Sequence, residues 1–454
     1  MSPKEVSVLD MMEARDRRAE LQRCMTAAFH VPVISFTMNI AGPVKRTPLI
    51  RRGFVLGLRT LRRRLKAAGF PVLHEELLDE FTGCEAFLAV DAGLLAIKAL
   101  TSDIENSGPL GRLFDMDVIS PEGEKAEREM LGLSGRTCLL CGRPAKECAR
   151  SRTHTVAELQ DRTFTILTEA AAEADAEQIA GAACRALLCE VCTTPKPGLV
   201  DRENSGSHRD MDIFTYMSSA SALYPYFRKC AETGIRTAEL PPEAAFAQLR
   251  APGRDAEGVM LEATGGVNTH KGAIFSVGLV SAALGRLSPE ERKDPAAVLS
   301  VCAAMTKGLT ERAFSGLTPE KARTAGQRFY LQYGIRGVRG QAEDGFPAIL
   351  EAGLPVLEQG LAEGLSLNDA GCAALLHILA AEADTNMIAR SSLETAEEFR
   401  GAIRELLQET PFPDRETLEA LDLRFRELNL SPGGSADLLA ICYLLHFMKT
   451  ETLV

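Results

Sequence analysis

The chain has 454 residues, of which 46% are hydrophobic and 25% charged, with no Trp and a formal net charge of -11. These values are typical of an ordinary globular protein of two or three domains and exclude a disordered or fibrous chain. The first residues, MSPKEVSVLDMMEARDRRAEL, are polar and charged, and no run of about 18 apolar residues follows. We therefore expect a cytoplasmic protein with no membrane or nucleic-acid partner, whose twelve scattered cysteines stay reduced.

The first 170 residues mix strand and helix patterns. Runs rich in β-branched and aromatic residues predict strands at 31–40, 84–90 and 114–120, and helical periodicity separates them, as at 51–68. This combination predicts an α+β domain at residues 1–170.

The rest of the chain is expected to be all helical. Four Ala-rich and Leu-rich segments show helical periodicity, at 169–191, 295–314, 368–384 and 435–448, and strand patterns are almost absent. The composition changes from polar to Ala-rich around 167–173. We therefore expect a second, all-helical domain at 171–454.

The two expected domains differ in charge. Residues 1–170 carry 24 Lys and Arg against 23 Asp and Glu, whereas residues 171–454 carry 27 against 39. A basic run in the first domain has no acidic residue before Glu75 and consists of Lys45, Arg46, Arg51, Arg52, Arg59, Arg62, Arg63, Arg64 and Lys66. It is either the solvated face of a helix or a dock for an acidic partner or a triphosphate.

Asp115 and Asp117 lie two residues apart in GPLGRLFDMDV, on a predicted strand. Because side chains alternate along a strand, both carboxylates point to one face and could hold Mg²⁺. A Gly ahead of an Asp–apolar–Asp–apolar strand resembles the metal strand of nucleotidyltransferases, although their Gly-Ser spacing is not clear here. The alternative is an exposed turn with two solvated carboxylates.

A Cys/His cluster follows in CLLCGRPAKECARSRTH. Cys138, Cys141, Cys148 and His154 supply four ligands, enough for tetrahedral Zn²⁺, although the spacing is atypical. The alternative is a group of structural thiols or nucleotide contacts, since the nearby arginines would also suit phosphates.

Four loops of the helical domain combine Gly or Pro with charged, amide and imidazole side chains. They read TPKPGLVDRENSGSHRDMD from Thr194, TGGVNTHKGAIF from Thr264, ADTNMIAR from Ala383 and NLSPGGSADLL from Asn429. Each loop alone is typical of an ordinary helix cap. Together they indicate a site for a phosphate-bearing substrate and its metal, because helix N-termini and glycine backbones favour anions.

These loops resemble the triphosphoribosyl-dephospho-coenzyme A synthase family over residues ~172–454. The motifs are TPKPGLVDR at Thr194, HRDM at His208, GVNTHKGAIF at Gly266, DTN at Asp384 and SPGGSADLL at Ser431. One departure is visible, since the family usually has Arg-Gly-Glu-Ala where this chain has Arg339, Gly340, Gln341 and Ala342. The nearby Glu343 is a possible substitute for the lost carboxylate.

Residues ~10–170 resemble the phosphoribosyl-dephospho-coenzyme A transferase of citrate lyase. The motifs are SFT at Ser35, GPVK at Gly42, PLGRLFDMDV at Pro109 and CLLC at Cys138. The whole chain thus resembles the fused, bifunctional form of the two enzymes.

In the helical domain the resemblance implies that the ribose 2′-hydroxyl of 3′-dephospho-coenzyme A attacks C1′ of ATP and releases adenine. It implies Asp210 or Glu262 as base or cation stabiliser, and His208 and His270 as donors to adenine or as groups that orient a carboxylate. Mg²⁺ is expected on Asp201, Asp384 and Asp437. The expected substrate contacts are Lys196, Arg202, Asn204, Asn268, Lys271, Asn386, Arg390 and Ser435.

In the first domain the resemblance implies that a serine of the citrate lyase acyl carrier (gamma) subunit attacks the α-phosphorus of that product and releases diphosphate. Asp115 and Asp117 would hold Mg²⁺, Lys45 and Arg112 would bind substrate, and the basic run would meet the acidic carrier. Two other functions stay open from sequence: the same synthesis for malonate decarboxylase, and a non-catalytic nucleotide-binding or zinc-binding scaffold.

Overall fold

A computed structural model describes residues 4–450 of the chain. The described chain divides into two compact units between Glu173 and Ala174. This division falls inside one continuous helix, α6 (Val156–Cys192), and not in a loop. Among the residues described, none of the helices combines the length and hydropathy that a membrane span requires.

The N-terminal unit contains a four-stranded antiparallel sheet with the order β2-β3-β1-β4. Its strands are β1 (Val33–Met38), β2 (Val72–Glu80), β3 (Gly83–Val90) and β4 (Phe114–Ile119). Its helices are α1 (Val8–Phe29), α2 (Pro48–Ala67), α3 (Leu94–Asn106), α4 (Gly108–Gly111) and α5 (Ala145–Ser151), with a 3₁₀ turn at Arg128–Leu131.

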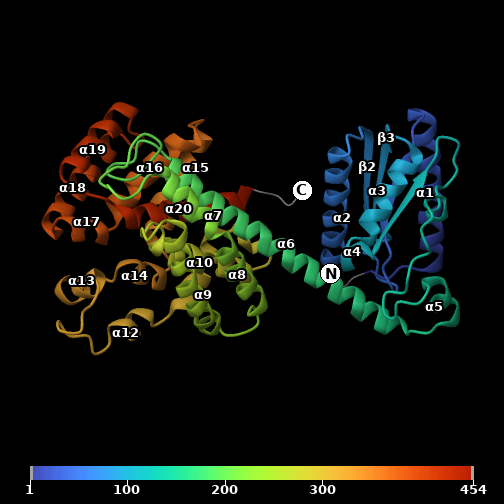
Figure 1. The fold of residues 1–454 in the computed structure, drawn as a ribbon, viewed down its shortest axis with the longest axis horizontal. Coiled ribbons are helices and arrows are strands. Elements are labelled where there is room, and N and C mark those ends of the chain that lie inside the picture. The colour runs from blue at the N-terminus through green and yellow to red at the C-terminus, as the bar shows by residue number, and fades with distance from the viewer. Residues whose placement is uncertain (1–3, 451–454) are drawn as a thin grey trace. The chain divides into compact units, whose positions relative to one another are not determined.

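The two faces of this sheet have different covers (Figure 1). One face packs Phe36, Met116 and other alternate residues against apolar side chains of α2 and α3, such as Leu61 and Ile97. On the opposite face, Met25 of α1 packs against alternate strand residues only at the end formed by Val33, Phe87 and Ala89. Polar residues occupy the rest of that face, where a site can form.

The sequence predicts three of the four strands and misses β2. This strand lies at the sheet edge and is mostly exposed, so its residues VLHEELLDE have no apolar alternation. Its acidic residues also change the charge of the basic run. Arg46 and Arg51 both contact Asp79, and Arg62 contacts Glu75. The basic run is therefore partly neutralised, and within it Arg59, Arg63 and Lys66 stay exposed on α2.

The C-terminal unit is all helical in its described part, as the periodicity predicts. After α6 come α7 (Ile213–Ala222), α8 (Tyr224–Arg236), α9 (Pro242–Ala263), α10 (Lys271–Arg286), α11 (Pro295–Thr306), α12 (Leu309–Phe314), α13 (Ala325–Tyr333), α14 (Gly337–Glu343), α15 (Leu354–Ala362), α16 (Leu367–Ala381), α17 (Thr385–Arg390), α18 (Leu393–Glu409), α19 (Arg415–Glu427) and α20 (Gly433–Thr450). Two short turns, at Glu291–Lys293 and Ile349–Gly353, complete the unit.

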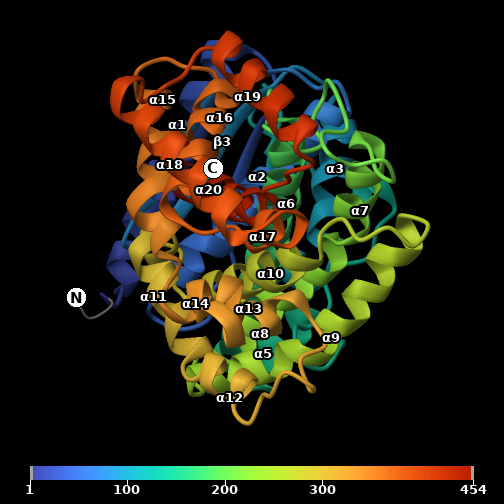
Figure 2. The ribbon, with the colours of Figure 1, turned by 90° about the vertical axis from the view of Figure 1, so that its left-hand side faces the viewer.

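Helices α10 and α20 form the centre of this unit and are buried along most of their length. Helices α15, α16, α18 and α19 lie on one side of α20, and α8, α9 and α12 lie on the other (Figures 1 and 2). Helix α8 approaches α10 very closely, because a Cβ at Gly285 would lie 2.3 Å from the carbonyl oxygen of Ala231. This close packing fixes the last turn of α10 against α8, and the first turn of α10 carries one of the sequence motifs.

Candidate active sites

A cavity of about 490 Å³ in the helical unit brings the four polar loops together, and we call it the central cavity. Its polar lining comes from the end of α6, the loop before α7 and the first turns of α10, α17 and α20. The sequence-predicted residues that line it are Lys196, His208, Asp210, Asn268, His270, Lys271, Asn386, Arg390 and Asp437.

The N-termini of α10 and α20 both open into the central cavity. Lys271 and Gly272 of α10 and Gly433 and Gly434 of α20 line it. A side chain at position 272 would displace the Asp437 carboxylate, because a Cβ there would lie 1.9 Å from its Oδ2. Backbone N–H groups and the helix dipole make such N-termini favourable for phosphate groups.

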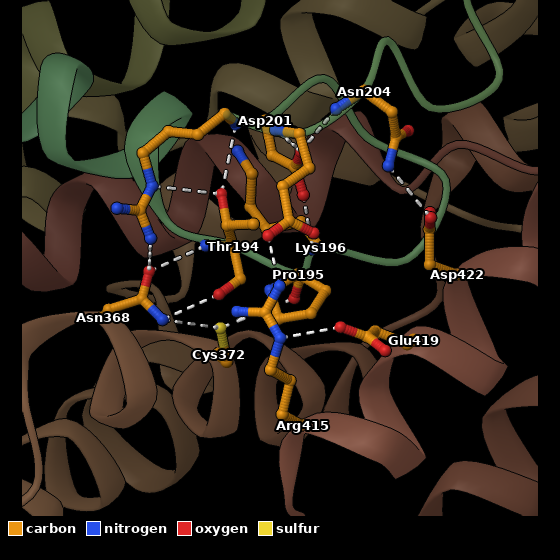
Figure 3. Close-up of polar contacts among 12 residues, drawn as sticks. Thr194, Pro195, Lys196, Asp201, Asn204, Asn368, Cys372, Arg415, Glu419 and Asp422 are labelled. Carbon is orange, nitrogen blue, oxygen red and sulfur yellow. Dashed lines mark hydrogen bonds and ion pairs between the residues drawn. The ribbon is translucent and has the colours of Figure 1, made fainter.

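The loop that follows α6 is fixed by residues from distant helices (Figure 3). Asn368 of α16 accepts a hydrogen bond from the backbone N–H of Thr194 at 2.9 Å and donates one to its carbonyl at 2.7 Å. Asp422 of α19 accepts from the N–H of Gly198 at 3.0 Å and from Nδ2 of Asn204 at 3.1 Å. These bonds hold the loop in a shape that directs Lys196 inward.

Several predicted site residues serve the backbone and do not line the cavity. Asp201 accepts from the N–H groups of Lys196, Glu203 and Asn204. Asp384 caps α17 and accepts from both the N–H and the hydroxyl of Ser435, at 2.7 and 3.0 Å. The side chain of Arg202 donates to Thr194 and Asn368, and Glu262 is exposed near the end of α9.

Two carboxylates lie in the wall of the central cavity. Glu190, in the last turn of α6, pairs with Lys196, and both side chains are buried. Asp437 of α20 is partly exposed to the cavity, is surrounded by protein atoms, and accepts from the N–H of Ala273. Burial, followed by the charge of Glu190, raises the pKa of Asp437 well above its usual range. Two carboxylates whose charges act on each other in one cavity wall favour a bound cation. Sequence reasoning missed Glu190, because it lies inside an ordinary helical pattern.

His270 is a buried neutral imidazole in the cavity wall. Its Nδ1 lies 2.7 Å from the hydroxyl of Ser219, which accepts a hydrogen bond from Thr269. Burial, with Lys196 nearby, lowers the pKa of His270 to about 3. The Nε2 atom has no partner among residues 4–450. The ring of Tyr216, which also lines the cavity and was not predicted from sequence, lies edge-on to it at 4.9 Å.

His208 differs from His270 because both of its ring nitrogens are occupied. Nδ1 accepts from Nη2 of Arg390 at 3.1 Å, and Nε2 lies 2.9 Å from the hydroxyl of Ser431. Since an arginine can only donate, the neutral ring carries its proton on Nε2. Burial, followed by the charge of Arg390, lowers the pKa of His208. His208 therefore orients Arg390, whose other contacts are the carbonyl of Ser207 and the side chain of Asn429.

Gln341, which stands where the family usually has Glu, places a buried amide in α14. Its Oε1 has no hydrogen-bond partner in the described chain. Glu343 is engaged elsewhere, because its carboxylate accepts from the N–H and the hydroxyl of Thr310. Neither residue lines the central cavity.

In the N-terminal unit, the paired carboxylates lie as the strand pattern predicts. Phe114, Met116 and Val118 are buried, whereas Asp115 is exposed and Asp117 is partly exposed. Ser35 is opposite Asp117 and Thr37 is opposite Asp115 on the neighbouring strand. Partial desolvation of its carboxyl group by neighbouring protein atoms, followed by the charge of Asp117, raises the pKa of Asp115.

A third carboxylate joins this pair from β3. Glu85 and Asp115 line a cavity of about 190 Å³, which we call the sheet cavity. Arg18 of α1 forms a bidentate ion pair with Glu85. Its Nη2 donates to Oε1 at 2.6 Å, and its Nε donates to Oε2 at 3.2 Å. The charges of Asp115 and Asp117 also act on Arg18. Sequence reasoning missed Glu85, which stands alone in the apolar run CEAFLAV.

Cationic side chains surround these carboxylates. Lys125 Nζ lies 2.7 Å from Asp117 Oδ1, and Arg136 Nη1 lies 3.8 Å from Asp115 Oδ1. Lys45 lines the sheet cavity and donates to the carbonyl of Ile40, and burial lowers its pKa. Arg112 does not line that cavity and donates to Thr137.

The Cys/His cluster is assembled. The ligand atoms of its four residues, Cys138, Cys141, Cys148 and His154, lie within 4.8 Å of one another. Gly142 has a positive φ of 72°, and its N–H donates to the carbonyl of Cys138. His154 Nε2 is buried and has no hydrogen-bond partner among the described residues. Hydrogen bonds from Arg143 and then His154 lower the pKa of Cys141 to about 5. The cluster can therefore hold a metal ion.

Comparison with known proteins identifies a family for each part of the chain. Residues 176–453 match the family described as ATP:dephospho-CoA triphosphoribosyl transferase, CitG. Residues 6–170 match the family described as apo-citrate lyase phosphoribosyl-dephospho-CoA transferase, CitX. The second match favours citrate lyase over malonate decarboxylase, and both matches argue against a non-catalytic scaffold.

Similar proteins carry the same two parts in one chain. "Protein CitXG" of Haemophilus influenzae is 34% identical over 448 residues, which is 96% of this chain and 95% of that protein. "Protein CitXG" of Leuconostoc mesenteroides subsp. cremoris is 31% identical, with 97% of each chain covered. The 2-(5''-triphosphoribosyl)-3'-dephosphocoenzyme-A synthase of Escherichia fergusonii is 40% identical over 282 residues, 61% of this chain and 93% of that protein.

The chain is thus a bifunctional transferase that forms triphosphoribosyl-dephospho-CoA from ATP and dephospho-CoA and transfers phosphoribosyl-dephospho-CoA to apo-citrate lyase. It belongs to the family of fused CitX–CitG proteins.

Proposed function

We propose that the central cavity binds ATP and is where adenine is replaced by dephospho-CoA. The observation that carries this proposal is the meeting of two desolvated carboxylates with two helix N-termini in one cavity. The N-termini of α10 and α20, with Lys271 and Arg390, suit the triphosphate. Of the predicted contacts, Arg202, Asn204 and Ser435 are assigned to holding the loops in place.

Glu190 and Asp437 are our candidates to hold Mg²⁺. They fit the ion because both carboxylates are desolvated in the cavity wall and a cation would relieve the repulsion that the charge of Glu190 exerts on Asp437. Mg²⁺ usually binds one or two protein carboxylates and takes its other ligands from phosphates and water. It would neutralise charge on the triphosphate. Asp201 and Asp384 are less suitable, because backbone N–H groups already occupy their oxygens.

The reaction forms a bond between the ribose 2′-oxygen of dephospho-CoA and C1′ of ATP and breaks the bond from C1′ to adenine. Asp210 lines the cavity and is exposed, so we assign it to accept the proton of the 2′-hydroxyl. His270 is assigned to adenine, since its free Nε2–H can donate a hydrogen bond to a ring nitrogen while the base leaves and takes up a proton from solvent. Tyr216 provides an apolar wall beside that position.

For the second reaction we propose the sheet cavity and its carboxylates. A serine oxygen of the carrier subunit bonds to the α-phosphorus, the bond to diphosphate breaks, and the serine proton is released. Asp115, Asp117 and Glu85 share one face and fit Mg²⁺, which would neutralise the phosphates. Lys45 and Arg136 are positioned to contact the phosphates. The exposed residues Arg59, Arg63 and Lys66 of α2 are a candidate surface for an acidic carrier.

We propose Zn²⁺ at the Cys/His cluster, in a structural role. Three thiols and one imidazole are a typical tetrahedral donor set, and His154 Nε2 is buried without a partner in residues 4–450. The cluster begins directly after Arg136 and Thr137. Arg136 lies near Asp115, and Thr137 accepts from Arg112. Holding the cluster together would therefore keep these arginines beside the metal-binding carboxylates.

The test uses the full-length chain, ATP, dephospho-CoA and Mg²⁺, with adenine release measured by chromatography. We expect Asp437→Asn to lose adenine release and also Mn²⁺ binding, measured by calorimetry in the presence of ATP. The variant should fold, because the raised pKa already favours a neutral group at this position. The exposed Glu427→Gln on α19 is the matched control. Normal adenine release by Asp437→Asn would refute the assigned site.

A further inference from the structure

A second, larger cavity of about 830 Å³ lies in the helical unit against α9 and α10, and we call it the arginine cavity. Its lining includes two acidic side chains, Glu243 and Glu257, neither of them buried. Four arginines from three helices line it as well, namely Arg250, Arg254, Arg312 and Arg339. None of the functions assigned above uses this cavity.

The arginines of this cavity are available for a ligand. Arg250, Arg254 and Arg339 form no ion pair within residues 4–450, and Arg312 donates to the carbonyl of Lys307. Glu257 is already paired, since its Oε2 lies 2.9 Å from Lys271 Nζ. The cavity therefore has an excess of positive charge. Guanidinium groups match the oxygens of phosphate groups with paired hydrogen bonds.

The remaining wall of the cavity is apolar and partly aromatic. Phe246 and Phe275 lie edge to face with their ring centroids 6.2 Å apart. Leu249, Leu279 and Leu309 extend this surface. A ligand of this cavity would combine phosphate groups with a base or an aliphatic arm, because binding sites pair apolar walls with a few polar anchors.

The arginine cavity adjoins the central cavity at the first turns of α10. Lys271 lines the central cavity, and its ion-pair partner Glu257 lines the arginine cavity. Ile274, one turn further along α10, lines the arginine cavity and accepts from the hydroxyl of Tyr226 at 2.9 Å. The Lys271–Glu257 pair thus links the linings of the two cavities.

We propose that the arginine cavity binds dephospho-CoA and presents its ribose 2′-hydroxyl to the central cavity. Its diphosphate lies against Arg250 and Arg254, and its adenine and pantetheine parts lie on the apolar wall. This assignment rests on the proposed function, which puts ATP in the central cavity. The two cavities suit different anions. Desolvated carboxylates favour a metal-bound triphosphate in the central cavity, whereas free arginines suit a diphosphate diester without a metal.

The test is steady-state kinetics of adenine release by the full-length chain, with each substrate varied in turn. We expect Arg250→Ala and Arg254→Ala each to raise KM for dephospho-CoA on the order of tenfold and to leave KM for ATP unchanged, as loss of a hydrogen bond to a charged group does. Arg250→Lys and Arg254→Lys keep the positive charge but lose the paired N–H donors of the guanidinium group. Their KM for dephospho-CoA should therefore lie between that of the wild type and that of the alanine variants. Arg424→Ala on α19 is the control for a lost surface arginine.

A binding measurement separates this inference from the proposed function. Calorimetry with dephospho-CoA alone should show weaker binding to Arg250→Ala and normal binding to Asp437→Asn. A rise in KM for ATP alone, or no change in either KM, would overturn the assignment of the arginine cavity. Unchanged adenine release by Asp437→Asn would instead overturn the ATP site, and the effect of Arg250→Ala on dephospho-CoA binding would still stand.

Discussion

Nδ1 of His270 lies 2.7 Å from Oγ of Ser219, and this contact underlies the tautomer that we assign to the ring. The Ser219 hydroxyl accepts from Thr269 at 2.8 Å, so its own proton is available to His270 Nδ1. In the tautomer that we assign, Nδ1 accepts and the neutral ring keeps its proton on Nε2, a buried atom of a residue that lines the central cavity. A buried imidazole is thereby prepared as a neutral hydrogen-bond donor.

His270→Ala should lower the turnover number on the order of a hundredfold with little change in KM for ATP, because a donor used in the transition state is lost. Turnover and KM come from adenine release at varied ATP. His377→Gln is the control, since this imidazole contacts only the carbonyl of Pro411 in the described structure and lies outside the cavity. A rise in KM with unchanged turnover would show that His270 binds ATP without assisting adenine departure.

The depressed pKa of His270 also predicts a pH dependence of stability. The unfolded chain takes up a proton on this imidazole near pH 6.5, whereas the folded chain does so only near pH 3. The unfolded state therefore binds more protons between these values, and stability falls as pH drops from about 6.5 toward 3. His270→Gln should show a shallower loss of melting temperature over pH 7 to 4 in calorimetry. A profile parallel to that of the wild type would mean that His270 titrates normally.

Asp115→Asn and Asp117→Asn should each reduce transfer to the carrier subunit more than about a hundredfold while adenine release continues. The reason is that only the N-terminal unit loses metal-binding carboxylates. Transfer is measured as the mass gain of the carrier protein. Asp103→Asn is the matched control, because this exposed carboxylate of α3 pairs with Arg64 on the surface. Near-normal carrier modification by both variants would remove the metal role from β4.

Removal of zinc should affect only the second reaction. Cys148→Ser is expected to abolish binding of about one Zn²⁺ per chain, measured by atomic emission, and to reduce carrier modification by ~10–100-fold. Adenine release should persist, since the helical unit does not use this metal. Cys24→Ser, an exposed thiol of α1, is the control. A fully active protein free of zinc would contradict the proposed role.

Patterns repeated along the chain were enough to predict much of the fold and of the candidate sites. Alternation predicts β4 and the shared face of Asp115 and Asp117, and helical periodicity predicts the all-helical unit. The edge strand β2 was missed because neither of its faces is buried well enough to impose alternation. Glu85 and Glu190 were missed for a different reason. Each is a single carboxylate in an otherwise apolar or helical pattern. Its ion-pair partner, Arg18 for Glu85 and Lys196 for Glu190, comes into contact only in the folded chain.

The motifs identified the loops of the helical unit but could not assign a task to each residue within them. Asp201 and Asp437 are both acidic residues of a Gly-rich motif. In the structure Asp201 accepts backbone N–H groups, whereas Asp437 lines the central cavity. The difference arises because Asp201 lies in a tight turn, where the backbone N–H groups need a hydrogen-bond acceptor and its carboxylate provides one. The sequence shows that both residues are acidic, but it does not show which one binds backbone N–H groups and which one lines the cavity.

The buried Glu190–Lys196 pair gives the last prediction, in which folding and activity are separated. Lys196→Met leaves Glu190 without its cation and should lower the free energy of unfolding of the helical unit by about 3–5 kcal/mol. Glu190→Gln should destabilise it similarly, because Lys196 is then buried alone. The double variant replaces both charges with neutral groups and should regain most of the lost stability, as measured by calorimetry.

The pH dependence of Lys196→Met provides a check on this reasoning. Burial already raises the pKa of Glu190 above the value of 4.5 that the unfolded chain has, and loss of Lys196 raises it further. A group whose folded pKa is raised stabilises the folded state at low pH and loses that contribution as pH rises. The deficit of Lys196→Met should therefore grow between pH 5 and pH 8. The double variant should be folded at both pH values yet release no adenine, because it lacks a carboxylate for Mg²⁺. Full activity in a stable double variant would show that the pair serves packing alone.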